Sequence, residues 1–374
     1  MSSIDFTSFL KLMAHQKASD LFITAGMPPS MKVHGKLSPI TQAPLTPQQS
    51  KDLVLNVMTP QQREEFEKTH ECNFAIGVSG VGRFRVSCFY QRNQVGMVLR
   101  RIETRIPTVE ELNLPPVIKT LAMTKRGIII FVGATGTGKS TSLAAMIGYR
   151  NMNSTGHIIT IEDPIEFVHK HEGCTITQRE VGIDTEDWDI ALKNSLRQAP
   201  DVILMGKVRD RKTMELAVAF AETGHLCMAT LHANSANQAL DRIINFFPEE
   251  RRDQLLMDVS LNLKALISQR LIPRQEGKGR TAAVEIMLNT PLMADLIFKG
   301  QVGELKELMK RSRELGMQTF DQAIFDLYEG QVITYEDALR NADSVNDLRL
   351  QIKLNSQRAR VTDLSAGTEH LTIV

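Results

Sequence analysis

Residues 133–141 form a glycine-rich run whose residue types and spacing suit phosphate binding. The run reads Gly133-Ala134-Thr135-Gly136-Thr137-Gly138-Lys139-Ser140-Thr141 and fits the pattern G-x-x-x-x-G-K-[ST]. Glycines let backbone N–H groups approach phosphates closely, and a helix that follows adds the positive end of its dipole. The pattern assigns Lys139 to the β- and γ-phosphates and the Ser140 hydroxyl to Mg²⁺. The predicted cofactors are therefore ATP and Mg²⁺.

The segments on either side of this run support the same chemistry. Residues 128–132 are wholly apolar, which is typical of a buried parallel strand, and residues 142–147 have the composition of a helix. A strand, a glycine loop and a helix are what a phosphate cradle requires. The alternative is a glycine loop that fits the pattern by accident, and the flanking strand counts against it.

Three carboxylates lie at the end of the next predicted strand and just beyond it. Glu162, Asp163 and Glu166 lie within the segment Thr160–Glu166. Carboxylates so close together repel one another, so a purely structural reason for them is hard to find. In a nucleotide hydrolase they would activate water and hold Mg²⁺ indirectly. The alternative is an ordinary charged loop at a strand end.

The segment Leu196–Asp210 contains an apolar strand that runs into a polar end. This arrangement is typical of a Walker B motif, in which a carboxylate holds the water shell of Mg²⁺. A buried strand with a charged loop after it would look the same.

A histidine ends another predicted strand. His232 lies between Thr230 and Asn234, both capable of hydrogen bonding. A lone histidine is more often structural, but ligands bind at the carboxyl ends of strands in open α/β sheets. We therefore favour a role for His232 as a phosphate sensor.

Arginines mark two strands in the N-terminal part. The strand 82–90 alternates, with Phe84 and Val86 on one face and Arg85 on the other, and residues 96–102, which include Arg100, are its predicted partner. Two such strands can simply be solvated edges. Alternatively, an arginine could be supplied to a phosphate on another subunit.

The periodicity of the chain changes near Pro107. A break in pattern beside a proline places a linker at 104–108, and Thr108 with Glu111 predicts a capping box that opens a helix. Beyond it, strands alternate with helices, which indicates an α/β domain. The predicted strands are 127–132, 157–162, 202–205 and 226–231. The predicted helices are 139–150, 188–197, 211–223, a long one over Pro248–Arg270, 320–329 and 335–341. We expect a mobile tail at 354–374.

Composition narrows the class of protein. The 374 residues carry a net charge of +1 and no basic stripe, which argues against a nucleic-acid partner and a DNA-directed motor. The four cysteines form no C-x-x-C pair, so no zinc or redox site is expected. We expect no transmembrane helix and no signal peptide, hence a cytoplasmic protein.

The glycine run, Thr160–Glu166, Leu196–Asp210 and Thr230–Ser235 together resemble the Walker A, aspartate-box, signature and histidine-box motifs of secretion-type ATPases. Within that class the chain resembles the type IV pilus retraction ATPases, the PilT/PilU family, over residues 5–354, and it is most similar to the accessory branch. The extension ATPases carry a paired-cysteine zinc motif that is absent here.

The resemblance implies a fold and partners. It implies a PAS-like α+β N-terminal domain (1–103), joined by the linker to a RecA-like P-loop NTPase domain (109–353), in a homo-hexamer. The implied activity is ATP hydrolysis that drives pilus retraction and twitching motility. The implied partners are the main retraction ATPase PilT and the inner-membrane platform protein. The location implied is the cytoplasmic face of the inner membrane, with membrane contact only through partners.

The resemblance also implies catalytic residues. Glu166 matches the general base of the aspartate box, and His232 matches the histidine of the histidine box, with His225 a second histidine near it. Arg85 and Arg100 match arginines that the N-terminal domain contributes to a nucleotide site at a subunit boundary.

One departure from the family pattern bears on turnover. The signature expects Gly-Glu at 206–207, and this chain has Gly206-Lys207. An ammonium there repels Mg²⁺, at a cost on the order of a few kcal/mol in a partly buried site. Two functions therefore stay open: an accessory retraction motor, or a subunit that binds ATP but hydrolyses it poorly and assists the main motor. Phe298-Lys299, where the main motor usually carries Arg-Glu, favours an accessory role.

Overall fold

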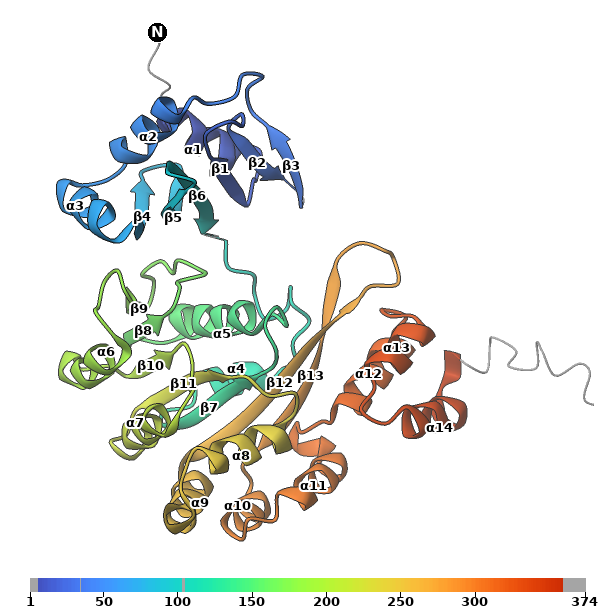
Figure 1. The fold of residues 1–374 in the computed structure, drawn as a ribbon. Coiled ribbons are helices and arrows are strands. Elements are labelled where there is room, and N and C mark those ends of the chain that lie inside the picture. The colour runs from blue at the N-terminus through green and yellow to red at the C-terminus, as the bar shows by residue number, and fades with distance from the viewer. Residues whose placement is uncertain (1–5, 34, 103–104, 359–374) are drawn as a thin grey trace, which may run out of the picture. The chain divides into compact units, whose positions relative to one another are not determined.

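The structure is a computed structural model that describes residues 6–33, 35–102 and 105–358. These residues form two compact units (Figure 1). The first contains the chain up to Ile106 together with Asp163–His169 and Arg179–Ala191, and the second contains Pro107–Glu162, Lys170–Gln178 and the chain from Leu192 onward. Part of the predicted linker, residue 104, and most of the predicted tail, residues 359–374, lie outside the described ranges.

The N-terminal unit is built on an antiparallel sheet. The sheet order is β3-β2-β1-β6-β5-β4, and the described residues of this unit before 103 include three helices. The elements are α1 Phe6–His15, β1 Asp20–Ile23, β2 Ser30–Val33, β3 Lys36–Pro39, α2 Pro47–Asn56, α3 Pro60–Thr69, β4 Glu71–Val78, β5 Gly82–Gln91 and β6 Gln94–Ile102.

The alternation predicted for β5 is confirmed. Phe84, Val86 and Cys88 are buried in the core of this unit, while Arg85 on the opposite face is half-buried. β6 is the antiparallel partner of β5, as predicted. The unit therefore has one apolar face that packs against its helices and one polar face that carries arginines.

The chain from residue 107 alternates strands and helices. Its elements are α4 Val117–Ala122, β7 Gly127–Val132, α5 Lys139–Asn153, β8 Gly156–Glu162, β9 Cys174–Glu180, α6 Trp188–Ser195, β10 Val202–Met205, α7 Arg211–Glu222, β11 Leu226–Leu231, α8 Ala236–Asn245, α9 Arg252–Asn262, β12 Leu263–Pro273, β13 Arg280–Leu288, α10 Pro291–Phe298, α11 Leu305–Arg311, α12 Phe320–Glu329, α13 Tyr335–Asn341 and α14 Val345–Asn355. Between residues 107 and 358, short 3-10 helices cover Leu196–Gln198, Glu249–Arg251, Val302–Glu304 and Arg313–Leu315.

The second sheet has the order β13-β12-β7-β11-β10-β8-β9. The four predicted strands β7, β8, β10 and β11 are confirmed and pair in parallel. Every residue of β7 is buried, and its two edges pair with β11 and β12. Parallel strands bring their carboxyl ends to one edge, so the segments after β7, β8, β10 and β11 meet there.

The long helix predicted over Pro248–Arg270 is wrong. α9 ends at Asn262, and the chain continues at once as β12, which pairs in parallel with β7 and antiparallel with β13. Apolar residues in a buried strand can coincide with helical spacing, and pairing on both sides of β12 decides the conformation here.

The helix predicted to open at Thr108 is also wrong, although its capping box forms. The Thr108 N–H donates to Glu111 Oε2 at 2.9 Å, and the Glu111 N–H donates to Thr108 Oγ1 at 3.1 Å. The segment is a turn, and the next helix, α4, starts only at Val117. Pro115 and Pro116 explain the difference, because the residue before a proline disfavours helical geometry.

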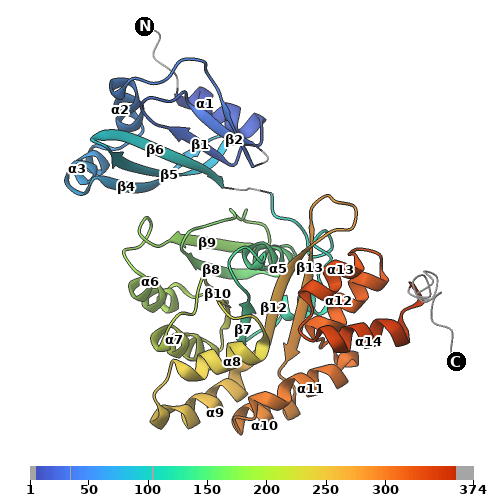
Figure 2. The same cartoon turned by 45° about the vertical axis from the view of Figure 1, so that its right-hand side comes forward.

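The C-terminal helices pack beside the β12–β13 hairpin. α12 contacts β13 and α13 contacts β12, and these helices share a small apolar core that includes Phe320 and Leu348 (Figure 2). Within the described ranges no helix is long and apolar enough to cross a membrane. The four cysteines are buried and free.

Candidate nucleotide site

The glycine loop between β7 and α5 has a backbone that only glycine suits. Gly133, Gly136 and Gly138 have φ values of +157°, +81° and +87°. A Cβ on Gly133 would lie 2.5 Å from Thr137 Oγ1, and one on Gly138 would lie 2.7 Å from Gln269 Nε2. Gly138 is the N-cap residue of α5, and among the described residues no side chain forms a hydrogen bond that caps this helix end. The loop thus presents backbone amides and a helix N-terminus, which is the cradle an anion needs.

Two side chains converge on the first residue of this loop. Lys139 is buried, and its Nζ donates to Gly133 O at 2.8 Å and to Ala134 O at 2.7 Å. His232 Nδ1 lies 3.2 Å from Gly133 O, which makes Nδ1 the protonated nitrogen in this contact. The predicted phosphate-binding lysine and the predicted sensor histidine therefore lie together at the carboxyl ends of β7 and β11.

The electrostatics of His232 reflect its neighbours. Burial lowers the pKa of its imidazole, and the positive charges of Lys207 and Lys139 lower the pKa further. Both effects favour the neutral imidazole. Because Lys207 acts on His232 through its charge, the residue that departs from the family signature belongs to the same electrostatic environment.

Backbone and side-chain bonds fix the segment that carries Lys207. The Gly206 N–H donates to Ile161 O at 2.8 Å and the Val208 N–H donates to Thr230 O at 2.8 Å. Thr230 Oγ1 also donates to Gly206 O. The segment is therefore held between the ends of β8 and β11, while the Lys207 side chain itself is exposed.

Gln269 is a site residue that sequence reasoning missed. Its Oε1 accepts a hydrogen bond from Ser142 Oγ, two residues after Ser140, at 2.7 Å, and both side chains are buried. Gln269 thus ties β12 to the first turn of α5. The sequence does contain a sign of the β12–β13 hairpin that carries Gln269: Gly277 and Gly279 lie between two apolar runs, as is typical of a hairpin turn.

A cavity of about 620 Å³ opens beside the loop. Its walls come from the loop, from the segment that follows β11 and from the polar face of α8. The lining residues are Ala134, Thr135, His232, Ala233, Asn234, Gln238, Asp241, Arg242 and Asn245. The lining is as apolar as it is polar, and Asp241 and Arg242 are its acidic and basic side chains, so it offers contacts to both charged and apolar parts of a ligand.

The three carboxylates after β8 differ in their surroundings. Glu162 Oε1 accepts hydrogen bonds from Thr160 Oγ1 at 2.6 Å and from Gln178 Nε2 at 3.2 Å, which fix its side chain. Asp163 and Glu166 are exposed and belong to a segment that is grouped with the N-terminal unit. The role of Glu166 as a general base stays a prediction.

Arg85 and Arg100 lie directly opposite each other on β5 and β6. Like charges in such positions repel, and Asp20, which is opposite Arg100 on β1, offsets this. Arg100 Nε donates to Asp20 Oδ1 at 2.9 Å, while most of the arginine side chain, 72%, is exposed. Their role at a neighbouring subunit stays a prediction.

His225 does not lie near His232. It precedes β11, and His232 follows it, so the whole strand of six residues separates them. At about 3.3 Å per residue this is roughly 20 Å. The His225 ring bonds locally, with Nδ1 2.9 Å from Thr223 Oγ1. His225 therefore lies at the amino end of β11, with ring contacts to Thr223 and Phe220.

Comparison with known proteins places this site in a family. A family model described as Type II/IV secretion system protein matches residues 5–340. The type IV pilus ATPase PilU of Pseudomonas aeruginosa is 66% identical over 99% of this chain and 97% of its own length. The chain belongs to the PilT/PilU family of secretion ATPases.

Two further comparisons support membership of the same family. The type IV pilus retraction ATPase PilT of Pseudomonas aeruginosa is 42% identical over 91% of this chain and 98% of its own length. A crystal structure of the pilus retraction motor PilT with bound ADP superposes with a TM-score of 0.86, at 38% identity, and covers 93% of this chain and 99% of that chain. The predicted fold class, an N-terminal domain joined to a RecA-like ATPase domain, is thereby confirmed.

Proposed function

We propose that this chain is an ATP-dependent motor of type IV pilus retraction, of the accessory, PilU-like kind. The observation that carries the proposal is the meeting of Lys139 and His232 at Gly133 O, in a glycine loop shaped for phosphate, within a chain of this family. The relatives that support it are named as a pilus ATPase and a pilus retraction ATPase.

The residues present suit ATP and Mg²⁺. The Gly133–Gly138 backbone would hold the phosphates, Lys139 would pair with their charge, and the Ser140 hydroxyl at the start of α5 would ligate Mg²⁺. When bound, Mg²⁺ supplies positive charge to the transferring phosphate. Neutral His232 donates one hydrogen bond and reports the position of the loop.

In the proposed reaction, Glu166 orients the attacking water and takes its proton. Arg85 and Arg100 come from the neighbouring subunit of a homo-hexamer and stabilise charge that develops on the phosphate. The hexamer works at the cytoplasmic face of the inner membrane, with the platform protein and the main retraction ATPase PilT as its partners.

A second function is favoured by Lys207. Its charge acts on His232 at the nucleotide site, where the family signature has an acid that supports Mg²⁺. In this alternative the chain binds ATP, joins the main motor and hydrolyses little by itself.

ATP hydrolysis decides between these functions. Rates are measured for the natural chain, Lys139→Ala and Lys207→Glu, each with and without PilT. If the chain is a motor, the natural chain should hydrolyse ATP and Lys139→Ala should not. Equal rates in these two proteins would rule out ATP hydrolysis at this site. Turnover that appears only in Lys207→Glu would establish the binding subunit instead. The link to pili is tested separately, by whether the chain restores twitching motility to a Pseudomonas aeruginosa strain that lacks PilU.

A further inference from the structure

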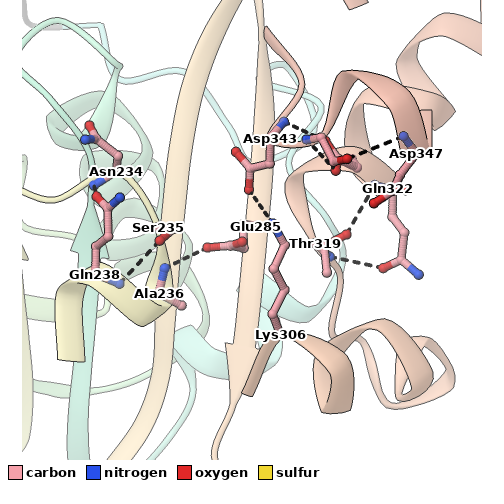
Figure 3. Close-up of polar contacts among 12 residues, drawn as sticks. Asn234, Ser235, Ala236, Gln238, Glu285, Lys306, Thr319, Gln322, Asp343 and Asp347 are labelled. Atoms are coloured by element: carbon pink, nitrogen blue, oxygen red, sulfur yellow. Dashed lines mark hydrogen bonds and ion pairs between the residues drawn. The ribbon is translucent and has the colours of Figure 1, made fainter. Parts of the chain in front are cut away.

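The junction between the histidine segment and α8 is held from both sides by one hairpin. Arg270 on β12 donates from Nη2 to the carbonyl oxygen of Asn234 at 3.3 Å. Glu285 on β13 accepts at Oε1 from the backbone N–H of Ala236 at 2.7 Å. Ser235, between these two residues, caps α8. Figure 3 shows Glu285 reaching toward Ala236 from its strand.

The far side of Arg270 is bound to the C-terminal helices. Its Nη1 donates to the carbonyl oxygen of Asn341, the last residue of α13, at 2.8 Å. Its Nη2 lies 2.6 Å from Asp343 Oδ1, and the guanidinium stacks on the Phe320 ring at 3.9 Å from the ring centre. One planar side chain thus joins the histidine segment to α12 and α13, which is a task for which arginine is suited and lysine is not.

Asp343 is itself held in a fixed position. Lys306 Nζ lies 2.8 Å from Asp343 Oδ2 (Figure 3). The Asp343 N–H donates to Asp321 Oδ1 at 2.7 Å. The Ser344 N–H donates to the other oxygen of Asp321 at 3.2 Å. These contacts hold the turn between α13 and α14 in place, so that the Asp343 carboxylate is a fixed acceptor for Arg270.

Glu285 is only 2% exposed. Burial raises the pKa of its carboxyl group above the usual range, and Asp343 raises it further, while the Ala236 N–H at the start of α8 and the charge of Lys306 lower it. A buried carboxylate is costly, and apolar residues of similar volume usually stabilise a core as well or better. Stability alone therefore does not account for a carboxylate here, whereas fixing the backbone beside His232 does.

We propose that Arg270 and Glu285 are positioning residues: they transmit the placement of the C-terminal helices to the segment 232–236 at the nucleotide site. The inference deepens the proposed function and rests on it where it concerns turnover. Through this link, a partner that shifts α12–α14 would change hydrolysis without touching the nucleotide.

The test combines amide exchange with kinetics on the full-length chain. Amide exchange of residues 232–236 is measured by mass spectrometry, the Kd for ADP by fluorescence, and kcat by phosphate release. Arg270→Gln and Glu285→Ala should speed exchange of this segment about tenfold. They should lower kcat on the order of ten- to a hundredfold, and the Kd for ADP should stay within about twofold. Glu285→Gln keeps an oxygen acceptor for the Ala236 N–H and should restore slow exchange.

Two further variants make the test specific. Arg340→Gln removes an exposed arginine that pairs with Asp337 on the same helix α13, at 3.5 Å, and should leave exchange of 232–236 unchanged. If Arg270 acts through Asp343, the double variant Arg270→Gln/Asp343→Asn should match either single variant.

Unchanged exchange at 232–236 in Arg270→Gln would overturn the proposal, as would an equal increase in Arg340→Gln or additive effects in the double variant. A natural chain that hydrolyses no ATP would overturn the proposed motor alone, because amide exchange still decides the positioning role.

Discussion

Lys139 and His232 share one acceptor: Gly133 O lies 2.8 Å from Lys139 Nζ and 3.2 Å from His232 Nδ1. Lys139 begins α5, after the glycine loop that follows β7, and His232 directly follows β11, the strand that pairs with β7. A shift of the Gly133 carbonyl would therefore change the hydrogen bond that His232 makes to it. The same arrangement adds to the lowering of the histidine pKa by burial and by Lys207, since the Lys139 ammonium disfavours an imidazolium beside it.

Replacing Lys207 should change the titration of His232. Burial and the charges of Lys207 and Lys139 lower the pKa of His232, so the imidazole gains its proton only below the usual histidine range. Lys207→Glu exchanges a repulsive charge for an attractive one and should raise this pKa. The measurement is a pH titration of the histidine ring signals by NMR, assigned with His232→Gln. Lys278→Glu, in the turn between β12 and β13, is the control. A pKa of His232 at or above the usual value in the natural chain would contradict this prediction.

Lys139→Ala should weaken nucleotide binding. The lysine supplies charge-assisted hydrogen bonds to phosphate, so we expect a rise in the Kd for ADP of about ten- to a hundredfold. Fluorescence titration with a labelled ADP measures it. Lys310→Ala, at an exposed lysine of α11, should bind ADP as the natural chain does. Unchanged affinity in Lys139→Ala would show that ADP binds elsewhere.

Gly138→Ala should destabilise the fold more than Gly136→Ala. Both glycines have positive φ, so each substitution costs about 1–2 kcal/mol of backbone strain. A Cβ at 136 meets nothing within 4 Å, whereas one at 138 lies 2.7 Å from Gln269 Nε2 and adds about 1–3 kcal/mol. Urea denaturation of the two variants gives the difference. Equal losses of stability would mean that Gln269 moves aside without cost.

Arg100→Gln should abolish hydrolysis and spare ADP binding, if Arg100 acts at a neighbouring subunit. An arginine that stabilises phosphoryl transfer contributes on the order of a thousandfold or more in kcat. Arg92→Gln, in the β5–β6 turn, should have no effect. Mixing Arg100→Gln with Lys139→Ala should recover part of the activity, because some interfaces then join an intact arginine to an intact loop. Failure to recover any activity in mixed oligomers would refute action across the interface.

The strands around the site were predictable because their residues allow little else. β7, β10 and β11 are short apolar runs bounded by glycine or polar residues, and such runs are typical of buried parallel strands. The glycine loop was predictable for the same reason, since three of its residues adopt backbone angles that other residues avoid.

β12 was not predictable from local pattern. Leu263, Leu266 and Ile267 continue the apolar spacing of α9, and nothing in that spacing marks the change at Asn262. The change is decided by a pairing with β7, more than a hundred residues earlier in the chain. Gln269, Arg270 and Glu285 were missed with it, because a residue on a misassigned element cannot be placed at a site.

The position of β12 also limits where the chain can be truncated. β7 carries the phosphate loop and is wholly apolar, and β12 covers the side of it that β11 does not. A fragment that ends before Leu263 would leave an uncovered, hydrophobic strand edge of the kind that recruits other chains into aggregates. We therefore expect that a fragment in which this strand edge stays covered extends at least to the end of β12 at Pro273.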